Sequence, residues 1–194
     1  MGDSVTPLFA NDGRFLAEAL AAGGQGSRDG GRTRSALLRR AAQIAQRELG
    51  DLDAAFAWLG DSIIGHVDDA SLESLDELGR EVGDVQRVDG ALTRALEEVF
   101  DGPLVRKLLR RRADIRKGEL KDNLGAAGDL KRLHDLSPAD QDLTKELSEM
   151  LSQLGDHRGM IELLEDQILR GRQPHVRAEL ARKVAHIWEE QIGD

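Results

Sequence analysis

The sequence of 194 residues contains no cysteine and no tyrosine, and aromatic residues make up only 3% of it. Without cysteine the chain can form no disulfide, no thiol nucleophile and no thiolate metal site. The shortage of aromatic side chains argues against a surface on which bases or sugars stack. Proline is also rare, and Pro103, Pro138 and Pro174 all fall between long stretches that favour helix. These absences remove several kinds of site before any motif is considered.

Long apolar runs are absent as well. No run approaches the ~20 residues that cross a bilayer, and the beginning of the chain, "MGDSVTPLFANDG", lacks the basic and then apolar layout of a signal peptide. The net charge is −9, whereas proteins that hold a phosphate backbone usually present a basic face. The sequence therefore predicts a soluble protein with a default cytoplasmic location, and it favours neither a membrane nor a nucleic acid as partner.

A Gly-Asp pair recurs along the chain. It begins at Gly50, Gly83, Gly155 and Gly193, and Lys121-Asp122 is a near copy. The four spacings between these five pairs alternate as 33, 38, 34 and 38, and intervals taken two at a time are 71, 72 and 72. A fixed period of this size is typical of helical repeats. The alternation indicates that the repeating unit is a pair of hairpins.

The chemistry of the pair explains why it marks a helical hairpin. Glycine after an apolar run adopts the left-handed conformation that ends a helix, and the aspartate that follows caps the next helix. Apolar residues recur at helical spacing around each pair. We expect first helices near 35–49, 70–82, 103–120, 139–154 and 175–192, and second helices near 51–65, 84–99, 122–135 and 156–170. The predicted fold is all-α, an α-α superhelix of antiparallel hairpins with about four and a half repeats.

The stretch "LGDLDAAFAWL", with the small residue Ala55 opening its second helix, resembles the tetratricopeptide repeat family. Further matches are Ala95, Ala126, Leu130 and Pro138. The resemblance covers about residues 35–194 and implies stacked helix pairs with a concave peptide-binding face. The aromatic residue expected early in each first helix is missing, and HEAT-like hairpins are the neighbouring alternative.

The two ends of the sequence differ from the middle. Residues 1–33 are expected to hold a short helix, which is a partial repeat, and a Gly-rich flexible linker, whereas 34–194 forms the array. The chain stops at a turn that a second helix should follow, so we expect a fragment of a longer array. Part of an apolar stripe should then stay uncovered, which favours a homodimer or end-to-end stacking. The stripe consists of Leu180, Val184, Ile187, Trp188 and Ile192.

No constellation for catalysis stands out. The five histidines are scattered and form no metal-binding pair. Neighbouring acids such as Glu97 and Glu98 are typical of a solvated helix surface. The Gly-rich stretch 23–31 has no strand before it and no Lys-Ser or Lys-Thr after it, which excludes a phosphate-binding loop. We expect no enzyme, and no catalytic, cofactor or metal site.

Charge separates two neighbouring first helices. Residues 68–84 carry a net charge of −6 and residues 103–121 a net charge of +6. The simpler interpretation is that the two helices neutralise each other. The functional interpretation is a scaffold whose concave groove binds a peptide or an acidic segment of a partner protein. The resemblance implies that the groove is lined by Arg40, Ile44, Arg111, Ile115, Lys145 and Ile187. A purely structural spacer and a helical-repeat RNA-binding protein are the alternatives.

Overall fold

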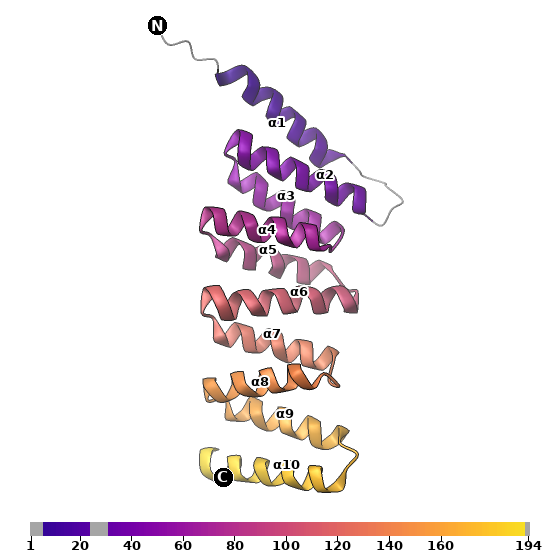
Figure 1. Cartoon of the computed structure of the whole chain (residues 1–194), viewed down its shortest axis with the longest axis vertical. Helices are drawn as coiled ribbons and strands as arrows, with labels where there is room; N and C mark the ends of the chain where they lie inside the picture. The colour runs from indigo at the N-terminus through magenta and orange to yellow at the C-terminus, as the bar shows by residue number, and fades with distance from the viewer. Residues whose placement is uncertain (1–5, 24–30, 193–194) are drawn as a thin grey trace. The chain divides into compact units, whose positions relative to one another are not determined.

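The computed structural model describes residues 6–23 and 31–192, and the side chains of 13–23 and 31–191. The described residues form helices and no strand, which confirms the all-α prediction (Figure 1). Contacts divide the chain into a first unit that ends at Leu120 and a second that begins at Lys121. The α-helices are α1 Thr6–Ala22, α2 Arg32–Ile44, α3 Leu52–Gly65, α4 Asp69–Val82, α5 Val85–Glu98, α6 Gly102–Ile115, α7 Asn123–Leu136, α8 Gln141–Leu154, α9 His157–Arg170 and α10 Pro174–Ile187.

The repeated Gly-Asp pairs are helix ends and helix caps, as the sequence predicts. Gly50, Gly83 and Gly155 have φ values of 65°, 72° and 66°, and Lys121 takes the same left-handed conformation at 57°. The aspartate after each of them caps the next helix by accepting a bond from the N–H three residues on. These caps are Asp51, Asp84, Asp122 and Asp156, at distances of 3.0, 3.3, 2.9 and 2.9 Å. Each hairpin turn is therefore fixed by one backbone conformation and one side chain.

The alternating spacing has a structural origin. Every second first helix is lengthened by a turn of π-helix, which follows α2, α6 and α10 at Ala45–Leu49 (η1), Arg116–Leu120 (η2) and Trp188–Ile192 (η3). The helices between them, α4 and α8, end without such a turn. The second helices α3, α5, α7 and α9 all have 14 residues. Since only the first helices vary in length, the true period is two hairpins.

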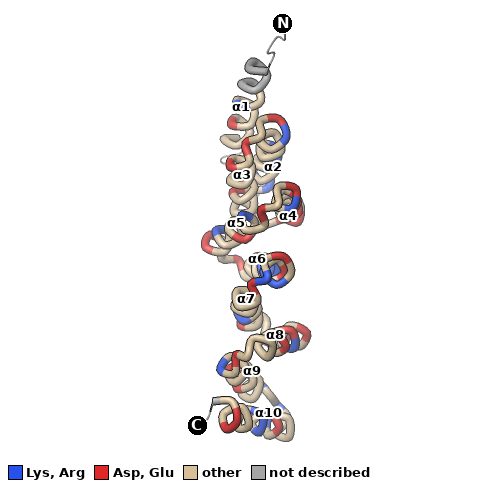
Figure 2. Tube along the Cα trace, turned by 90° about the vertical axis from the view of Figure 1, so that its left-hand side faces the viewer, with Lys and Arg blue, Asp and Glu red and all other residues tan. Residues whose placement is uncertain are grey.

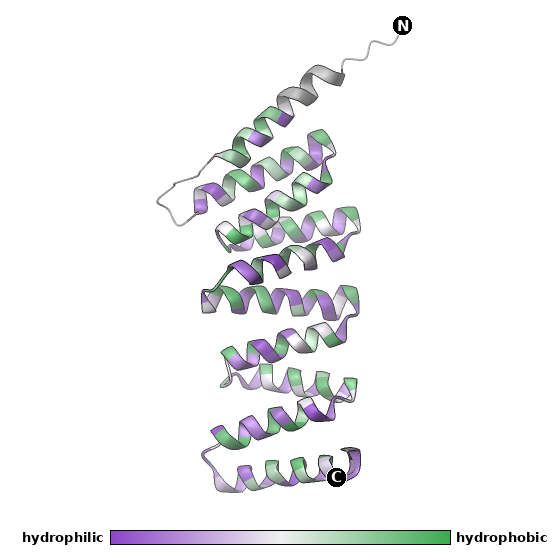
Figure 3. Cartoon of the chain, turned by 180° about the vertical axis from the view of Figure 1, so that it is seen from behind, coloured by the Kyte–Doolittle hydropathy of each residue, from purple (hydrophilic) through white to green (hydrophobic). Residues whose placement is uncertain are grey.

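In the first unit, α1 joins the array by packing on α2. Ala17 from α1 lies against Ala41 and Ile44 in a buried cluster, and Trp58 of α3 adds to it. The short N-terminal helix expected from the sequence is thus longer than predicted, because it begins at Thr6, and it behaves as a partial repeat. Green and purple alternate along each helix in Figure 3, as expected for helices with one buried face. Of the predicted Gly-rich linker, residues 24–30 lie outside the described residues, and α2 already begins at Arg32.

In the second unit, the core lies between α7, α8 and α9. It is built from Leu130, Leu147, Met150, Ile161 and Leu164. By contrast, none of the described residues of α10 is buried. Along its predicted apolar stripe, Leu180, Val184 and Ile187 are partly exposed, Trp188 is exposed, and the side chain of Ile192 lies outside the described part. Helix α10 therefore leaves part of its apolar face uncovered.

Candidate functional site

The groove residues inferred from the sequence are divided between the two units. Arg40, Ile44, Arg111 and Ile115 belong to the first unit, whereas Lys145 and Ile187 belong to the second. Ile44 and Ile115 are only 2% exposed. Each follows a buried residue by one helical turn, so each points into the core. The assignment of these two isoleucines to an accessible groove was wrong.

Two ion pairs bridge α4 and α6 in the first unit. Arg111 pairs with Asp76, and Lys107 pairs with Asp69 at 2.5 Å. Burial raises the pKa of Asp76 even though Arg111 donates a hydrogen bond to its carboxylate. The acidic helix and the basic helix thus neutralise each other at these positions. Figure 2 marks the acidic residues of both helices in red and the basic ones in blue. Mutual neutralisation is the simpler of the two interpretations of the charge pattern, and it leaves Arg111 already engaged.

Further polar contacts join helices of the first unit. Arg39 on α2 donates to both carboxylate oxygens of Asp68, at 2.8 and 2.9 Å, just before α4. Arg116 in η2 contacts Asp89 on α5 at 2.6 and 3.1 Å. Arg94 on α5 pairs with Asp61 on α3 at 2.6 Å. Arg40, by contrast, is exposed and donates to Gln43 on its own helix at 3.3 Å. In the first unit, charge is used largely to tie one helix to the next.

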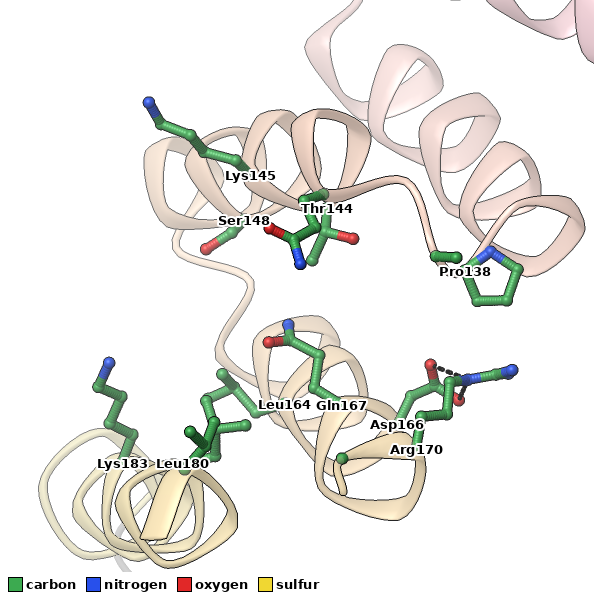
Figure 4. A pocket seen from close by; sticks show the side chains of 14 residues that line it. Pro138, Thr144, Lys145, Ser148, Leu164, Asp166, Gln167, Arg170, Leu180 and Lys183 are labelled. Atoms are coloured by element: carbon green, nitrogen blue, oxygen red, sulfur yellow. Dashed lines mark hydrogen bonds and ion pairs between the residues drawn. The ribbon is translucent and has the colours of Figure 1, made fainter. Parts of the chain in front are cut away.

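The second unit contains a cleft of about 860 Å³ between α8, α9 and α10 (Figure 4). Helix α8 supplies polar side chains, whereas α9 and α10 each supply both apolar and polar ones. The residues that border it include Gln141, Thr144, Lys145, Ser148, Leu164, Gln167, Val176, Leu180 and Lys183. Lys145 is the one residue of the predicted groove that borders this cleft.

The two ends of the cleft differ in chemistry. At one end, Lys145 of α8 and Lys183 of α10 extend to the same side of the view, where Ser148 also lies, and Lys145 points away from α9 and α10 (Figure 4). At the other end, Arg170 is held by Asp166 through contacts of 2.6 and 2.8 Å on the same helix. The Asp166 carboxylate raises the pKa of Arg170, so that arginine stays charged and paired. The lysine end is therefore the end at which the cleft offers positive charge.

A comparison of equivalent positions explains the open cleft. A shift of 72 residues takes α4, α5 and α6 onto α8, α9 and α10. The pair Asp69–Lys107 then becomes Gln141 and Glu179, and the pair Asp76–Arg111 becomes Ser148 and Lys183. Neither replacement can form an ion pair across the two helices. The corresponding cleft between α4 and α6 measures about 410 Å³, less than half as much.

The lysines of the cleft have carboxylate neighbours only on their own helices among the described ion pairs. Lys145 lies 3.9 Å from Glu149, and Lys183 lies 3.5 Å from Glu179. The lysine side chains are 77% and 58% exposed. Ion pairs of this kind contribute only about 0.3–0.5 kcal/mol. Both ammonium groups can therefore turn to another carboxylate at little cost.

Other kinds of site are not found in the described part of the chain. Its residues include no cluster of three or more His, Cys, Asp or Glu that could hold a metal ion. No described helix is long and apolar enough to cross a membrane.

No family model matches the sequence, and no curated protein matches it. The tetratricopeptide resemblance thus stays a prediction from the residues alone.

Sequence reasoning missed most of the residues that border the cleft. Gln141, Thr144, Ser148 and Gln167 are common polar residues on helices, and none belongs to a motif. A signal was nevertheless present, because the 72-residue shift exposes which acidic positions of α4 have lost their charge in α8. The informative feature is the loss of carboxylates at four positions, those equivalent to Asp69, Glu73, Asp76 and Glu81.

Proposed function

We propose that this protein is a non-catalytic scaffold that binds a segment of a partner protein in the cleft between α8, α9 and α10. The observation that carries the proposal is the open cleft of the second unit, set against the bridged cleft at the equivalent place in the first. The same three-helix frame is bridged by its own ion pairs in one case, and the equivalent ion pairs are missing in the other. An accessible cleft of this kind suits an external ligand.

The lining of the cleft fits a peptide. Clefts that bind ligands generally combine apolar walls with a few polar groups, over about 300–1,000 Å³. Here Leu164 and Leu180 supply apolar surface, and Thr144, Ser148 and Gln167 supply hydrogen-bonding groups. Helices of 14 residues are about 20 Å long, so an extended segment of about six residues would lie along them. A short linear segment of a protein is the ligand that matches this length and chemistry.

Self-association is a second interaction that one observation favours. The apolar side chains of α10 are incompletely covered, with Val176 37% and Trp188 36% exposed. Such a surface favours pairing with another chain. We expect concentration-dependent association, either as a homodimer or by end-to-end stacking, and sedimentation velocity at several concentrations measures it. A Trp188→Glu variant should shift the distribution towards the monomer.

Peptide selection tests the scaffold proposal. The whole chain is immobilised and panned against a phage-displayed library of random peptides of about ten residues, longer than the ~6 residues that span the cleft. Selected peptides are then measured against Gln167→Trp, which fills the cleft, and against Leu169→Trp on the same helix, where the native side chain is 83% exposed. Binding should be lost with the first variant and kept with the second.

The opposite results would decide for the alternatives. If no peptide is selected, or if all selected peptides bind Gln167→Trp as well as the parent chain, the cleft is no docking site and the spacer function is favoured. A single-stranded RNA pool run in parallel tests the nucleic-acid alternative, against which the net charge of −9 argues.

A further inference from the structure

We infer that the segment bound in this cleft is acidic and that one of its carboxylates occupies the place that Asp76 holds in the first unit. This inference rests on the proposed function. It adds the charge of the bound segment, the end of the cleft at which that charge lies, and the residues that bind it.

The first step concerns the carboxylate that the second unit lacks. In the first unit, Asp76 on α4 reaches across to the guanidinium of Arg111 on α6. At the equivalent positions of the second unit, the basic residue is retained as Lys183, whereas the acid is replaced by Ser148. Both residues border the cleft. The second unit has kept the cation of this bridge without the anion, and a partner's carboxylate can supply it.

The second step is a reversal of charge beside that position. Glu73 on α4 borders the cleft of the first unit, and its equivalent on α8 is Lys145. The change replaces a negative by a positive charge at the same end of the cleft as Lys183 (Figure 4). Two lysines at one end raise the local positive potential, and opposite charge both steers and retains an acidic ligand.

The third step fixes where the acidic residue lies. Arg170, at the far end of the cleft, is already held by the carboxylate of Asp166. An incoming carboxylate gains more at the lysine end, where the ion pairs with Glu149 and Glu179 are long and exposed. Between the ends, Leu164 and Leu180 offer an apolar wall. The expected ligand has an Asp or Glu followed or preceded by a large apolar residue.

The selected peptides give the first test. Asp and Glu should be enriched next to a large apolar residue, and affinity measured by fluorescence anisotropy should fall as salt is raised. Lys145→Ala and Lys183→Ala should each weaken binding about fivefold, the upper end of what an exposed ion pair contributes. Lys131→Ala is the matched control, because Lys131 is a half-exposed lysine of the same unit that pairs with Glu162 and does not border the cleft.

Moving the bridge of the first unit into the second gives a sharper test. Ser148→Asp combined with Lys183→Arg recreates the Asp76–Arg111 pair and should abolish binding of acidic peptides, with circular dichroism confirming that the helices are intact. Glu179→Gln, which removes the competing carboxylate beside Lys183, should instead raise affinity about twofold.

Failure of this inference is distinct from failure of the proposed function. If the selected peptides are neutral or basic, or bind Lys145→Ala and Lys183→Ala as tightly as the parent, the cleft binds peptides without reading their charge, and the inference is overturned while the scaffold stands. If panning yields no peptide, the scaffold itself is overturned.

Discussion

The two units contain the same three-helix frame but differ in the ion pairs that cross it and in the size of the cleft. Between α4 and α6, two ion pairs cross the gap and the remaining cleft is small; between α8 and α10, those pairs are missing and the cleft is twice as large. The apolar residues that build the frame are retained, as Leu75 and Leu147 illustrate, both at most 1% exposed. The difference teaches that in a repeat protein a few polar positions, rather than the core, determine whether a groove is structural or available.

The two units also differ in the residues at the crossing of the first helix with the second helix. A Cβ atom on Gly79 of α4 would lie 2.3 Å from Cγ2 of Val88 on α5, so these helices approach closely. The equivalent residues on α8 and α9 are Leu151 and Met160. Both side chains are larger than the glycine and the valine at the equivalent positions of the first unit. In the first unit, the crossing of α4 and α5 therefore depends on a glycine that has no counterpart in the second.

The largest expected effect comes from a pair of equivalent leucines. Leu92 on α5 is 0% exposed, whereas Leu164 on α9 is 8% exposed and borders the cleft. Leu92→Ala should lower the free energy of unfolding by about 3 kcal/mol, and Leu164→Ala by about 1.5 kcal/mol, because one side of Leu164 already faces open space. Urea unfolding followed by far-ultraviolet circular dichroism measures both. Equal losses would contradict the difference in packing between the units.

A glycine tests the close approach of α4 and α5. Gly79→Ala should cost about 2 kcal/mol, because its methyl group would overlap with Val88. Gly90→Ala is the control on α5, since nothing lies within 4 Å of its Cβ position, and it should stabilise the protein by about 1 kcal/mol through helix propensity alone. Should both variants gain stability in thermal unfolding, the two helices do not pack as closely as described.

The polar contacts of the first unit should appear in the pH dependence of stability. Burial opposes ionisation of Asp68, but hydrogen bonds from Ser71 and Arg39 outweigh it and lower its pKa below 3.8. Since the folded pKa lies below the unfolded one, this carboxylate stabilises the fold above about pH 4, and the contribution is lost as the pH falls through the lowered value. Asp68→Asn, which can still cap α4, should cost about 1 kcal/mol at neutral pH and progressively less in acid.

Asp76 serves as a control, because its pKa is shifted in the opposite direction from that of Asp68. Burial raises its pKa, so its ionisation weakens folding above the unfolded pKa and the penalty is relieved as the pH falls. Asp76→Asn should therefore cost less than Asp68→Asn at neutral pH. Parallel pH titrations of the free energy of unfolding compare the two, and a larger loss for Asp76→Asn would show that its bridge to Arg111 dominates its burial.

The smallest effect concerns the turn at which the second unit begins. Lys121 has a φ of 57°, a conformation that favours glycine. Lys121→Gly should raise the free energy of unfolding by about 0.5–1 kcal/mol, and the reciprocal Gly155→Lys should lower it by a similar amount. Chemical denaturation of the two variants checks the prediction. A stabilising Gly155→Lys would mean that the left-handed turns are not equivalent.

The regular part of the fold could be predicted from the sequence because turn chemistry is local. Glycine and aspartate place the helix ends, and Asp51 and Asp156 cap α3 and α9 as expected. The π-helical turns could not be predicted, since "AQREL" and "RKGEL" share no residue pattern that distinguishes a π-helix from an α-helix. Their conformation depends on packing with other helices, and that information is not contained in the segments themselves.

The candidate site was predicted less well, and the reason is again physical. The resemblance implies that Arg111 faces a partner, but Asp76 lies close enough to form an ion pair with it. Ile44 and Ile115 were placed by analogy with a family, although the spacing from the buried Ala41 and Arg112 puts both on the core face. Lys145 borders a cleft, and its assignment to a partner-binding groove stays a prediction. Pairwise distances across helices decide such cases, and a single sequence does not give them.

The π-helical turns also determine how many residues can be removed or duplicated without disturbing the order of helix lengths. Because a lengthened first helix alternates with a shorter one, removal of a single hairpin would bring two helices of the same length into succession and shift every later contact along the array. Removal or duplication of about 72 residues keeps the alternation. The double hairpin is therefore the smallest exchangeable module, and gene duplication or design that respects it copies a groove and its three walls as one piece.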